Sequence, residues 1–134
     1  MALWKTFYKD ILYNMIHTEY YKDGTSCECD SMRRTNYMSG ALMLEFPCAD
    51  GNIHGIERGY RESGSLLWEA PFIKGTKHGI YREYDLTGAL RLEIPYIDDV
   101  EHGIARHYSE SGSVIKEISW VKGAKAGLSK ENFL

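Results

Sequence analysis

Hydrophobic and polar positions alternate along most of this chain in short runs that are separated by glycine-containing turns. Between residues 66 and 73, every second position carries a large or apolar side chain: Leu66, Trp68, Ala70 and Phe72. The same period of two recurs at Leu90, Leu92, Ile94 and Tyr96, and it predicts β-strands. Residues 3–16 differ, because apolar pairs recur there every four positions. That pattern predicts one amphipathic helix.

The alternating segments belong to a repeat with a period of 24 residues. Its fixed positions are the glycines Gly40, Gly64, Gly88 and Gly112, the glutamates Glu45, Glu69, Glu93 and Glu117, and a second glycine set at Gly55, Gly79, Gly103 and Gly127. A histidine precedes three of that second set (His54, His78, His102), and a tyrosine closes the unit (Tyr60, Tyr84, Tyr108). A constant period of this length is typical of proteins in which repeats stack into one continuous core.

We therefore predict a mainly β protein, an elongated antiparallel β-hairpin repeat sheet with a short N-terminal capping helix. Residues 1–39 are expected to hold the helix and a degenerate first repeat, and residues 40–134 four 24-residue repeats, of which the last is a cap. The segment around Cys27–Cys29 and Arg33–Arg34 has no clear place in this scheme.

The register of each hairpin follows from its turn. Glycine opens the pairs Gly51-Asn52, Gly75-Thr76 and Gly123-Ala124, which suits two-residue loops with glycine at the first central position. Such loops place Phe72 opposite Gly79 and Glu69 opposite Arg82, with the equivalents Tyr96–Gly103, Trp120–Gly127, Glu93–Arg106 and Glu117–Lys130. An aromatic ring over glycine and opposite charges across a strand pair both stabilise a sheet. Pro47, Pro71 and Pro95 follow each glutamate by two residues, and they predict a bulge or unpaired point that bends the hairpin.

Composition excludes several classes of protein. With 134 residues, of which 43% are hydrophobic, the chain is expected to bury a core without metals or disulfides. A net charge of −3 is too close to neutral to favour nucleic acid or an acidic membrane. No apolar run approaches the ~18 residues of a membrane span, and the start lacks a cleavable signal pattern. We expect a cytoplasmic protein whose cysteines, Cys27, Cys29 and Cys48, are free thiols.

A family resemblance rests on the repeated motif. Residues 75–88, Gly-Thr-Lys-His-Gly-Ile-Tyr-Arg-Glu-Tyr-Asp-Leu-Thr-Gly, followed by a leucine-rich strand with Glu93, resemble the MORN repeat, and more closely the variant in YwqK-family proteins. The resemblance covers residues 40–134 and weakly 17–39. It departs at Asp99, where the turn glycine is absent, and at Ala126 and Asn132, where histidine and tyrosine are lost. It implies an elongated β-meander that acts as an interaction module, in some members a presumed antitoxin, with no shared catalytic residue.

Catalytic and metal sites are not expected. Equivalent residues of successive hairpins lie two strand spacings apart, about 9–10 Å, whereas zinc ligands lie only about 3.5 Å apart. His54, His78 and His102 cannot share one ion, and we expect them to hold the hairpin ends through ring hydrogen bonds. The same spacing argues against the glutamates as an acid–base pair. Cys48 could be a nucleophile beside His54, but its core-facing position favours packing. We predict no enzyme, cofactor or metal.

Binding remains, and tyrosine and arginine are frequent interface anchors. The predicted partner-binding residues are Arg58, Tyr60, Arg82, Tyr84, Arg106 and Tyr108, with the acidic turn Asp98, Asp99 and Glu101 as a second surface. The alternative is that the tyrosines pack along the ladder and the arginines neutralise the glutamates. We expect a protein-interaction module that neutralises or scaffolds a protein partner, as an antitoxin, an immunity protein or a phage-encoded inhibitor of a defence enzyme would. A membrane-lipid adaptor is the alternative, and a hydrolase using Cys48 is a remote one.

Overall fold

A computed structural model describes residues 31–126 and 130–131 of the chain. Within these ranges every regular element is a β-strand, and the strands form one antiparallel sheet. No helix in this part of the chain is long and apolar enough to span a membrane. The helix predicted for residues 3–16 lies outside the described residues, as does the Cys27–Cys29 segment. The predicted β-hairpin repeat architecture is confirmed.

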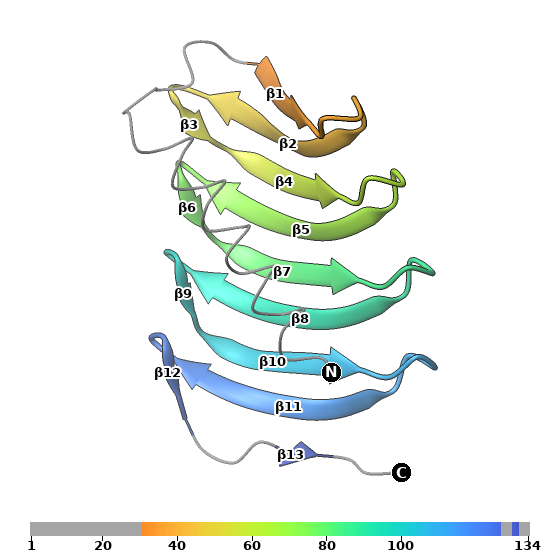
Figure 1. Cartoon of the computed structure of the whole chain (residues 1–134). Helices are drawn as coiled ribbons and strands as arrows, with labels where there is room; N and C mark the ends of the chain where they lie inside the picture. The colour runs from red at the N-terminus through yellow and green to blue at the C-terminus, as the bar shows by residue number, and fades with distance from the viewer. Residues whose placement is uncertain (1–30, 127–129, 132–134) are drawn as a thin grey trace.

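The sheet is a meander of two alternating strand types (Figure 1). Long strands of eight residues are β2 (Leu42–Ala49), β5 (Leu66–Ile73), β8 (Leu90–Ile97) and β11 (Val114–Val121). Strands of six residues are β1 (Ser31–Asn36), β4 (Gly55–Tyr60), β7 (Gly79–Tyr84) and β10 (Gly103–Tyr108). Short pieces of two residues complete the sheet: β3 (Asn52–Ile53), β6 (Thr76–Lys77), β9 (Val100–Glu101), β12 (Ala124–Lys125) and β13 (Lys130–Glu131). The main order is β1-β2-β4-β5-β7-β8-β10-β11-β12, so neighbours in the chain are neighbours in space.

The tight turns differ from the prediction by one residue. Ile73 lies opposite Thr76, so the two central residues are Lys74 and Gly75, and glycine takes the second position rather than the first. Their φ angles are 48° and 85°. Positive φ at both positions defines a type I′ turn, whose twist matches that of the flanking strands. The turns at residues 50–51, 98–99 and 122–123 share this conformation.

A bulge restores the predicted charge register beyond the turn. Phe72 lies opposite Lys77, whereas Glu69 lies opposite Arg82. Positions 78–81 therefore face only positions 70–71, and the extra residues are absorbed beside His78. The predicted pairing of Glu69 with Arg82 is confirmed, as are Glu93 with Arg106 and Glu117 with Lys130.

The predicted aromatic–glycine pairs are wrong in their direction. Phe72 lies opposite Gly55 of the preceding strand, not opposite Gly79. The structure likewise pairs Tyr96 with Gly79 and Trp120 with Gly103. The physical reason is the turn at Lys74-Gly75, which pairs Phe72 with Lys77 and so places Gly79 beyond the position across from Phe72. Each aromatic still lies over a glycine, but across the hairpin that precedes it in the chain.

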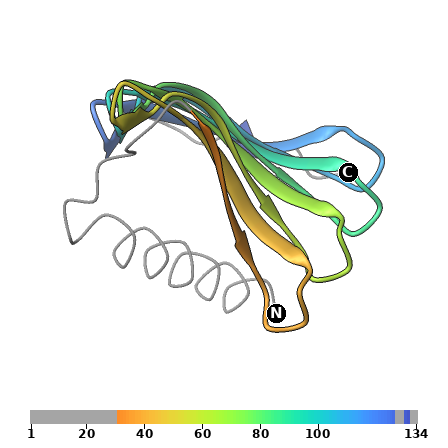
Figure 2. The same ribbon diagram turned by 90° about the horizontal axis from the view of Figure 1, so that it is seen from above.

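Proline occupies the point where the ladder is interrupted. The Pro71 carbonyl accepts a hydrogen bond from the His78 amide at 3.0 Å, and Pro47 and Pro95 repeat this contact with the next histidine amides at 3.1 and 3.0 Å. A strand residue directs its N–H and its C=O to the same neighbour. The missing proline N–H therefore falls inside the bulge, where the ladder needs no donor. The predicted interruption at each proline is confirmed, and the sheet curves over at the end that carries the tight turns (Figure 2).

Glycine is required beside each proline. Gly79 has a φ of +122°, and a Cβ there would lie 2.8 Å from Pro71 Cγ. The contacts of Gly55 with Pro47 and of Gly103 with Pro95 would be 2.7 and 2.9 Å. Both the backbone conformation and the available space therefore exclude a side chain.

One face of the sheet forms the core. Its buried cluster consists of Leu44, Phe46, Cys48, Ile53, Ala70 and Phe72, with Trp68 and Tyr81 packed against it. Cys48 thus takes the predicted core position and is 5% exposed. It is, however, disulfide-bonded, which corrects the expectation of a free thiol at this position.

We predict that Gly79→Val destabilises the fold by at least about 2 kcal/mol. Strained backbone costs ~1–3 kcal/mol, and overpacking against Pro71 adds ~1–3 kcal/mol. His78→Ala, which removes an exposed ring, is expected to cost less than ~1 kcal/mol. Urea titration monitored by circular dichroism measures both.

Gly64→Val is the matched control, because Gly64 has a φ of +95° but nothing within 4 Å of a Cβ. It should show the backbone cost without the clash. If Gly79→Val were no worse than this control, the proline contact would have no energetic role.

Candidate protein-binding face

Arginine and glutamate alternate in one straight row across the face opposite the core. The register pairs Arg34 with Glu45, Glu45 with Arg58, and so on to Glu117. We call this set the arginine–glutamate row: Arg34, Glu45, Arg58, Glu69, Arg82, Glu93, Arg106 and Glu117. Each of eight successive neighbouring strands contributes one member. Opposite charges therefore meet at every strand junction of the row.

Ion pairs connect members of the row within the strand pairs β1–β2, β4–β5, β7–β8 and β10–β11. The distances from arginine Nε to the glutamate carboxylate are 3.3 Å for Arg34–Glu45, 3.2 Å for Arg58–Glu69, 3.0 Å for Arg82–Glu93 and 3.4 Å for Arg106–Glu117. The arginine side chains are 34–58% exposed, whereas the glutamates are 14–29% exposed. An exposed pair alone contributes only about 0–1 kcal/mol, so the row acts mainly by specifying register, because a one-residue slip would move a charged side chain to the core face.

Tyrosine completes the coordination of each inner glutamate. Tyr60 donates its hydroxyl proton to Glu45 at 2.7 Å, and Tyr84 donates to Glu69 at 2.6 Å. Tyr108 makes the same bond to Glu93. Burial, reinforced by the bond to the carboxylate, raises the pKa of Tyr60 and of Tyr84 to about 12. The six predicted arginines and tyrosines thus lie together on one face. The arginines pair with the glutamates as the structural alternative expected, and the tyrosines also bind the glutamates through their hydroxyls, which that alternative did not include.

An aliphatic stripe borders the row and was missed by the sequence analysis. We call the six residues Ile56, Ile80, Ile104, Ile73, Ile97 and Val121 the isoleucine stripe, and they are 40–48% exposed. Ile56 and Ile80 lie opposite Pro71 and Pro95, which share their face. The signal in the sequence was an aliphatic residue recurring every 24 positions in phase with the glutamates. Exposed aliphatic side chains that gather on one face mark a candidate interaction surface.

The row and the stripe meet in an open hollow of about 320 Å³, lined by Ile80, Glu93, Pro95, Gly103, Ile104 and Arg106. Its base is the bare backbone of the glycine, and its walls combine aliphatic carbon with one charge of each sign. The predicted residues Arg106 and Glu93 therefore border a place where a partner side chain could insert.

The acidic turn lies apart from this face. Asp98 and Asp99 are the central residues of the β8–β9 turn, with φ angles of 47° and 70°. The Asp99 carboxylate accepts a hydrogen bond from the Lys77 amide at 2.6 Å, and its own amide donates to the Lys77 carbonyl at 2.9 Å. These bonds explain why aspartate can replace the turn glycine. Glu101 is on β9 and lies opposite Tyr96 of β8. The three acidic residues are therefore not members of the arginine–glutamate row.

Two of the three histidines hold the hairpin ends through ring hydrogen bonds, as predicted, whereas His78 Nδ1 lies 3.6 Å from the Asp98 carboxylate. His54 Nδ1 accepts a hydrogen bond from the Lys74 amide at 3.2 Å, and His102 Nδ1 accepts one from Lys122 at 3.3 Å. Each ring thus links one tight turn to the next. Within residues 31–126 and 130–131, no group of three or more histidine, cysteine or acidic side chains could hold a metal ion.

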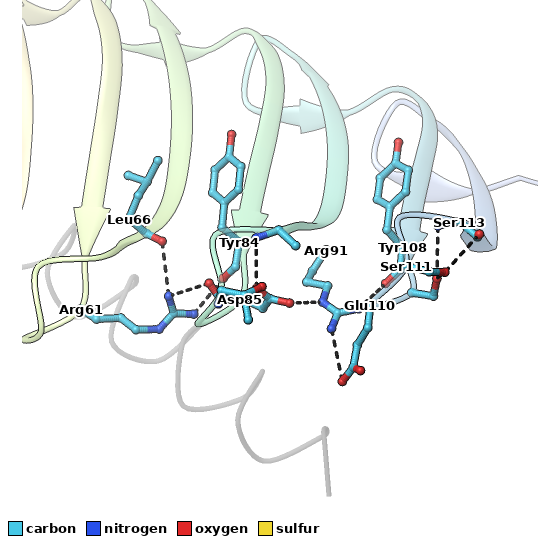
Figure 3. A network of polar contacts seen from close by, with 12 residues as sticks. Arg61, Leu66, Tyr84, Asp85, Arg91, Tyr108, Glu110, Ser111 and Ser113 are labelled. Atoms are coloured by element: carbon cyan, nitrogen blue, oxygen red, sulfur yellow. Dashed lines mark hydrogen bonds and ion pairs between the residues drawn. The ribbon is translucent and has the colours of Figure 1, made fainter.

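A second set of contacts, missed from the sequence, joins the repeats at their long loops (Figure 3). The Tyr84 carbonyl accepts a hydrogen bond from Arg61 Nη2 at 2.8 Å, and the Tyr108 carbonyl accepts one from Arg91 Nη1 at 3.2 Å. In the first junction the Tyr37 hydroxyl donates to the Tyr60 carbonyl at 2.7 Å. The backbone carbonyl at this position of the repeat (Tyr60, Tyr84, Tyr108) therefore accepts a hydrogen bond from a different side chain in each of the three junctions. Tyr37 and Arg61 are equivalent positions, 24 residues apart, whereas Arg91 comes from another position of the repeat. Sequence periodicity could not reveal these contacts, because the type of donor changes from one repeat to the next.

Asp85 organises the middle loop. Its carboxylate accepts hydrogen bonds from the Thr87 hydroxyl and amide, the Ala89 amide and Arg91 Nε. These bonds lower the pKa of the Asp85 carboxyl to about 2, and the bond from the Thr87 hydroxyl has the largest effect. Arg91 is thereby oriented toward the carbonyl of the next repeat.

The fold and these contacts define a β-hairpin repeat protein, and the comparison with known families agrees. The family described as the MORN repeat variant matches residues 77–98 and 101–122. The chain therefore carries two adjacent repeats of this variant. No curated protein is similar to the chain at a significant level.

Among solved structures, the chain is similar to the one titled "Crystal Structure of TarM", with a TM-score of 0.54 and 13% sequence identity. The similarity covers 87% of this chain and 23% of that one. The chain thus spans less than a quarter of the length of TarM, and at this level of identity the likeness concerns the fold alone.

We predict that alkaline pH weakens the fold through the tyrosines. Their pKa is higher in the folded state than the ordinary value of 10.0, so the stabilisation is complete below pH 10 and is lost as the pH rises toward 12. The thermal midpoint should fall over this window. The Tyr60→Phe, Tyr84→Phe variant, which cannot ionise there, should lose less between pH 10 and 12. An identical decline in both proteins would show that other groups control alkaline unfolding.

We predict that Arg61→Ala costs about 1–2 kcal/mol, because it leaves the carbonyls of Tyr84 and Asp85 without this donor. Arg33→Ala, at an exposed position of β1, is the control and should change stability by less than ~0.5 kcal/mol. Denaturant titration compares the two. Equal effects would remove Arg61 from the contacts that join the repeats.

Proposed function

We propose that this chain is a non-enzymatic protein-interaction module, which binds and neutralises or scaffolds a protein partner through the face that carries the arginine–glutamate row and the isoleucine stripe. The class is that of an antitoxin, an immunity protein or a phage-encoded inhibitor. One observation carries the proposal: six aliphatic side chains, each 40–48% exposed, share a face with a row of ordered charges. An apolar centre with a polar border is the usual composition of a protein interface.

The face is organised before any partner arrives. Arg58, Arg82 and Arg106 are held by ion pairs of 3.0–3.4 Å, and yet 34–41% of each side chain is exposed. A side chain that is already ordered loses little conformational entropy on binding. Arginine is also among the residues that most often dominate interface energy. The hollow at Ile80 and Ile104 offers a place for a partner side chain.

The arrangement of titratable groups supports binding rather than catalysis. Each inner glutamate of the row is engaged by an arginine and by a tyrosine hydroxyl, so its carboxylate is neutralised within the sheet. Equivalent groups repeat at two strand spacings, about 9–10 Å, instead of converging on one point. A nucleophile or general base would need a convergent group within hydrogen-bond reach.

A membrane-lipid adaptor is the alternative function. The row contains four arginines and four glutamates, so its own net charge is zero. An anionic lipid surface attracts clusters of four or more basic residues that no acids accompany. The alternating charges therefore favour a protein partner over a lipid surface.

The test is affinity capture from the source cells, followed by calorimetric titration with the purified partner. Ile80→Ser with Ile104→Ser should abolish binding, and Arg82→Ala with Tyr84→Ala should weaken it at least tenfold. Leu86→Ser is the matched control, because Leu86 is 79% exposed in a long loop away from the stripe. Circular dichroism and urea titration establish that each variant is folded.

Two outcomes would overturn the proposal. A folded Ile80→Ser, Ile104→Ser variant that binds with unchanged affinity would place the interface elsewhere. Sedimentation of the wild type with anionic liposomes, lost in the same variant, would favour the lipid adaptor.

A further inference from the structure

The arginine–glutamate row has a symmetry that the single chain does not use. From β1 to β11 its charges alternate, beginning with positive Arg34 and ending with negative Glu117. Because the number of members is even, the row read from the other end begins with a negative charge. Any operation that reverses the row and lays it on itself therefore places opposite charges face to face.

A two-fold axis performs this operation. If the axis lies parallel to the strands, between Glu69 and Arg82, each Glu69 meets Arg82 of the second copy. One step outward, Arg58 meets Glu93, and Glu45 then meets Arg106. A two-fold interface is isologous, so every such contact occurs twice. All members of the row find an opposite charge.

The same axis also matches the apolar surface. Rotation about a line parallel to the strands keeps each side chain at its height along the strand. The line of Ile56, Ile80 and Ile104 then covers the equivalent line of the second copy, with Pro71 and Pro95 between them. An axis perpendicular to the strands would instead lay aliphatic side chains against the long-loop end. One rotation thus satisfies the charges and the stripe together.

From this self-complementarity we propose that the face binds a second copy of this chain and forms a face-to-face two-fold dimer. Two aligned sheets pack about 10 Å apart at about 30°, so the positions nearest the axis are matched best. The donors for the contact exist. The ion pairs within the sheet run through arginine Nε, which leaves the terminal nitrogens of the guanidinium group for a carboxylate of the second copy.

The dimer does not rest on the proposed function. A heteromeric partner that uses the same face competes with the second copy, so partner binding would release monomers. Self-association of the purified protein is measured in the absence of any partner, and the two proposals can therefore fail separately.

The experiment is a charge-swap complementation measured by sedimentation velocity and native mass spectrometry over a range of concentrations. Wild type should dimerise. Arg58→Glu alone brings two carboxylates together at both symmetry-related contacts, and Glu93→Arg alone brings two guanidinium groups together. Each variant should dimerise at least tenfold more weakly. An equimolar mixture of the two should recover a mixed dimer, because position 58 of one chain then meets an opposite charge at position 93 of the other.

The mixture separates contact between copies from structural damage. Both substitutions also break an ion pair within the sheet, Arg58–Glu69 or Arg82–Glu93, and mixing cannot repair that loss. Arg33→Glu is the matched control, since its neighbour in sequence, Arg34, belongs to the row while Arg33 alternates onto the other face. It should leave dimerisation unchanged. If a variant fails to fold, Glu45→Arg and Arg106→Glu provide the same test one step further from the axis.

Wild type that stays monomeric over the whole concentration range would overturn the proposal. A wild-type dimer with no recovery in the mixture would equally place the contact on another surface.

Discussion

The engagement of Glu45, Glu69 and Glu93 by both neighbouring strands is the interaction on which this structure depends. Glu69 accepts the guanidinium of Arg58 from one side and the hydroxyl of Tyr84 from the other, and Glu45 and Glu93 repeat the arrangement. A one-residue slip of any strand would turn its charged side chain to the core face, where an unpaired charge is costly. The row therefore specifies register at every junction, although each pair alone contributes little free energy.

This register has to coexist with a tight turn that would impose a different one. The type I′ turn pairs Phe72 with Lys77, whereas the charge row pairs Glu69 with Arg82. A bulge at residues 78–81 accommodates the difference between the two registers, and two residues lower the free-energy cost of that bulge. Pro71 has no N–H to leave unpaired, and Gly79 accepts the positive φ and the close proline ring. The proline, the glycine and the histidine thus together form the bulge at which the sheet bends.

The binding role proposed for this surface rests on its repetition. Its charges are ordered by mutual contact, its aliphatic side chains share one face, and both features recur at the spacing of the hairpins. Contacts can therefore be distributed over several repeats, while the hollow beside Ile80 and Ile104 supplies a local anchoring point. The contacts that join the long loops, such as Arg61 to the Tyr84 carbonyl, keep neighbouring repeats in line. An interface of this kind depends on the whole array staying straight.

The sequence by itself determined the features that depend on periodicity. A spacing of 24 residues and a strand period of two led to the hairpin sheet, to the pairing of Glu69 with Arg82, to the interruption at each proline and to the structural role of the histidines. Each of these follows from residues near one another in the chain or from equivalent positions in successive repeats. The one-residue difference in the turn, the reversed aromatic–glycine pairing and the disulfide at Cys48 were decided by the tertiary structure. So were the hydrogen bonds from Tyr37, Arg61 and Arg91, whose residue type changes from repeat to repeat, and the isoleucine stripe, whose exposure depends on which face is buried. The physical reason is that a strand pattern records which residues alternate, whereas only packing decides which of two similar registers closes and which face meets solvent.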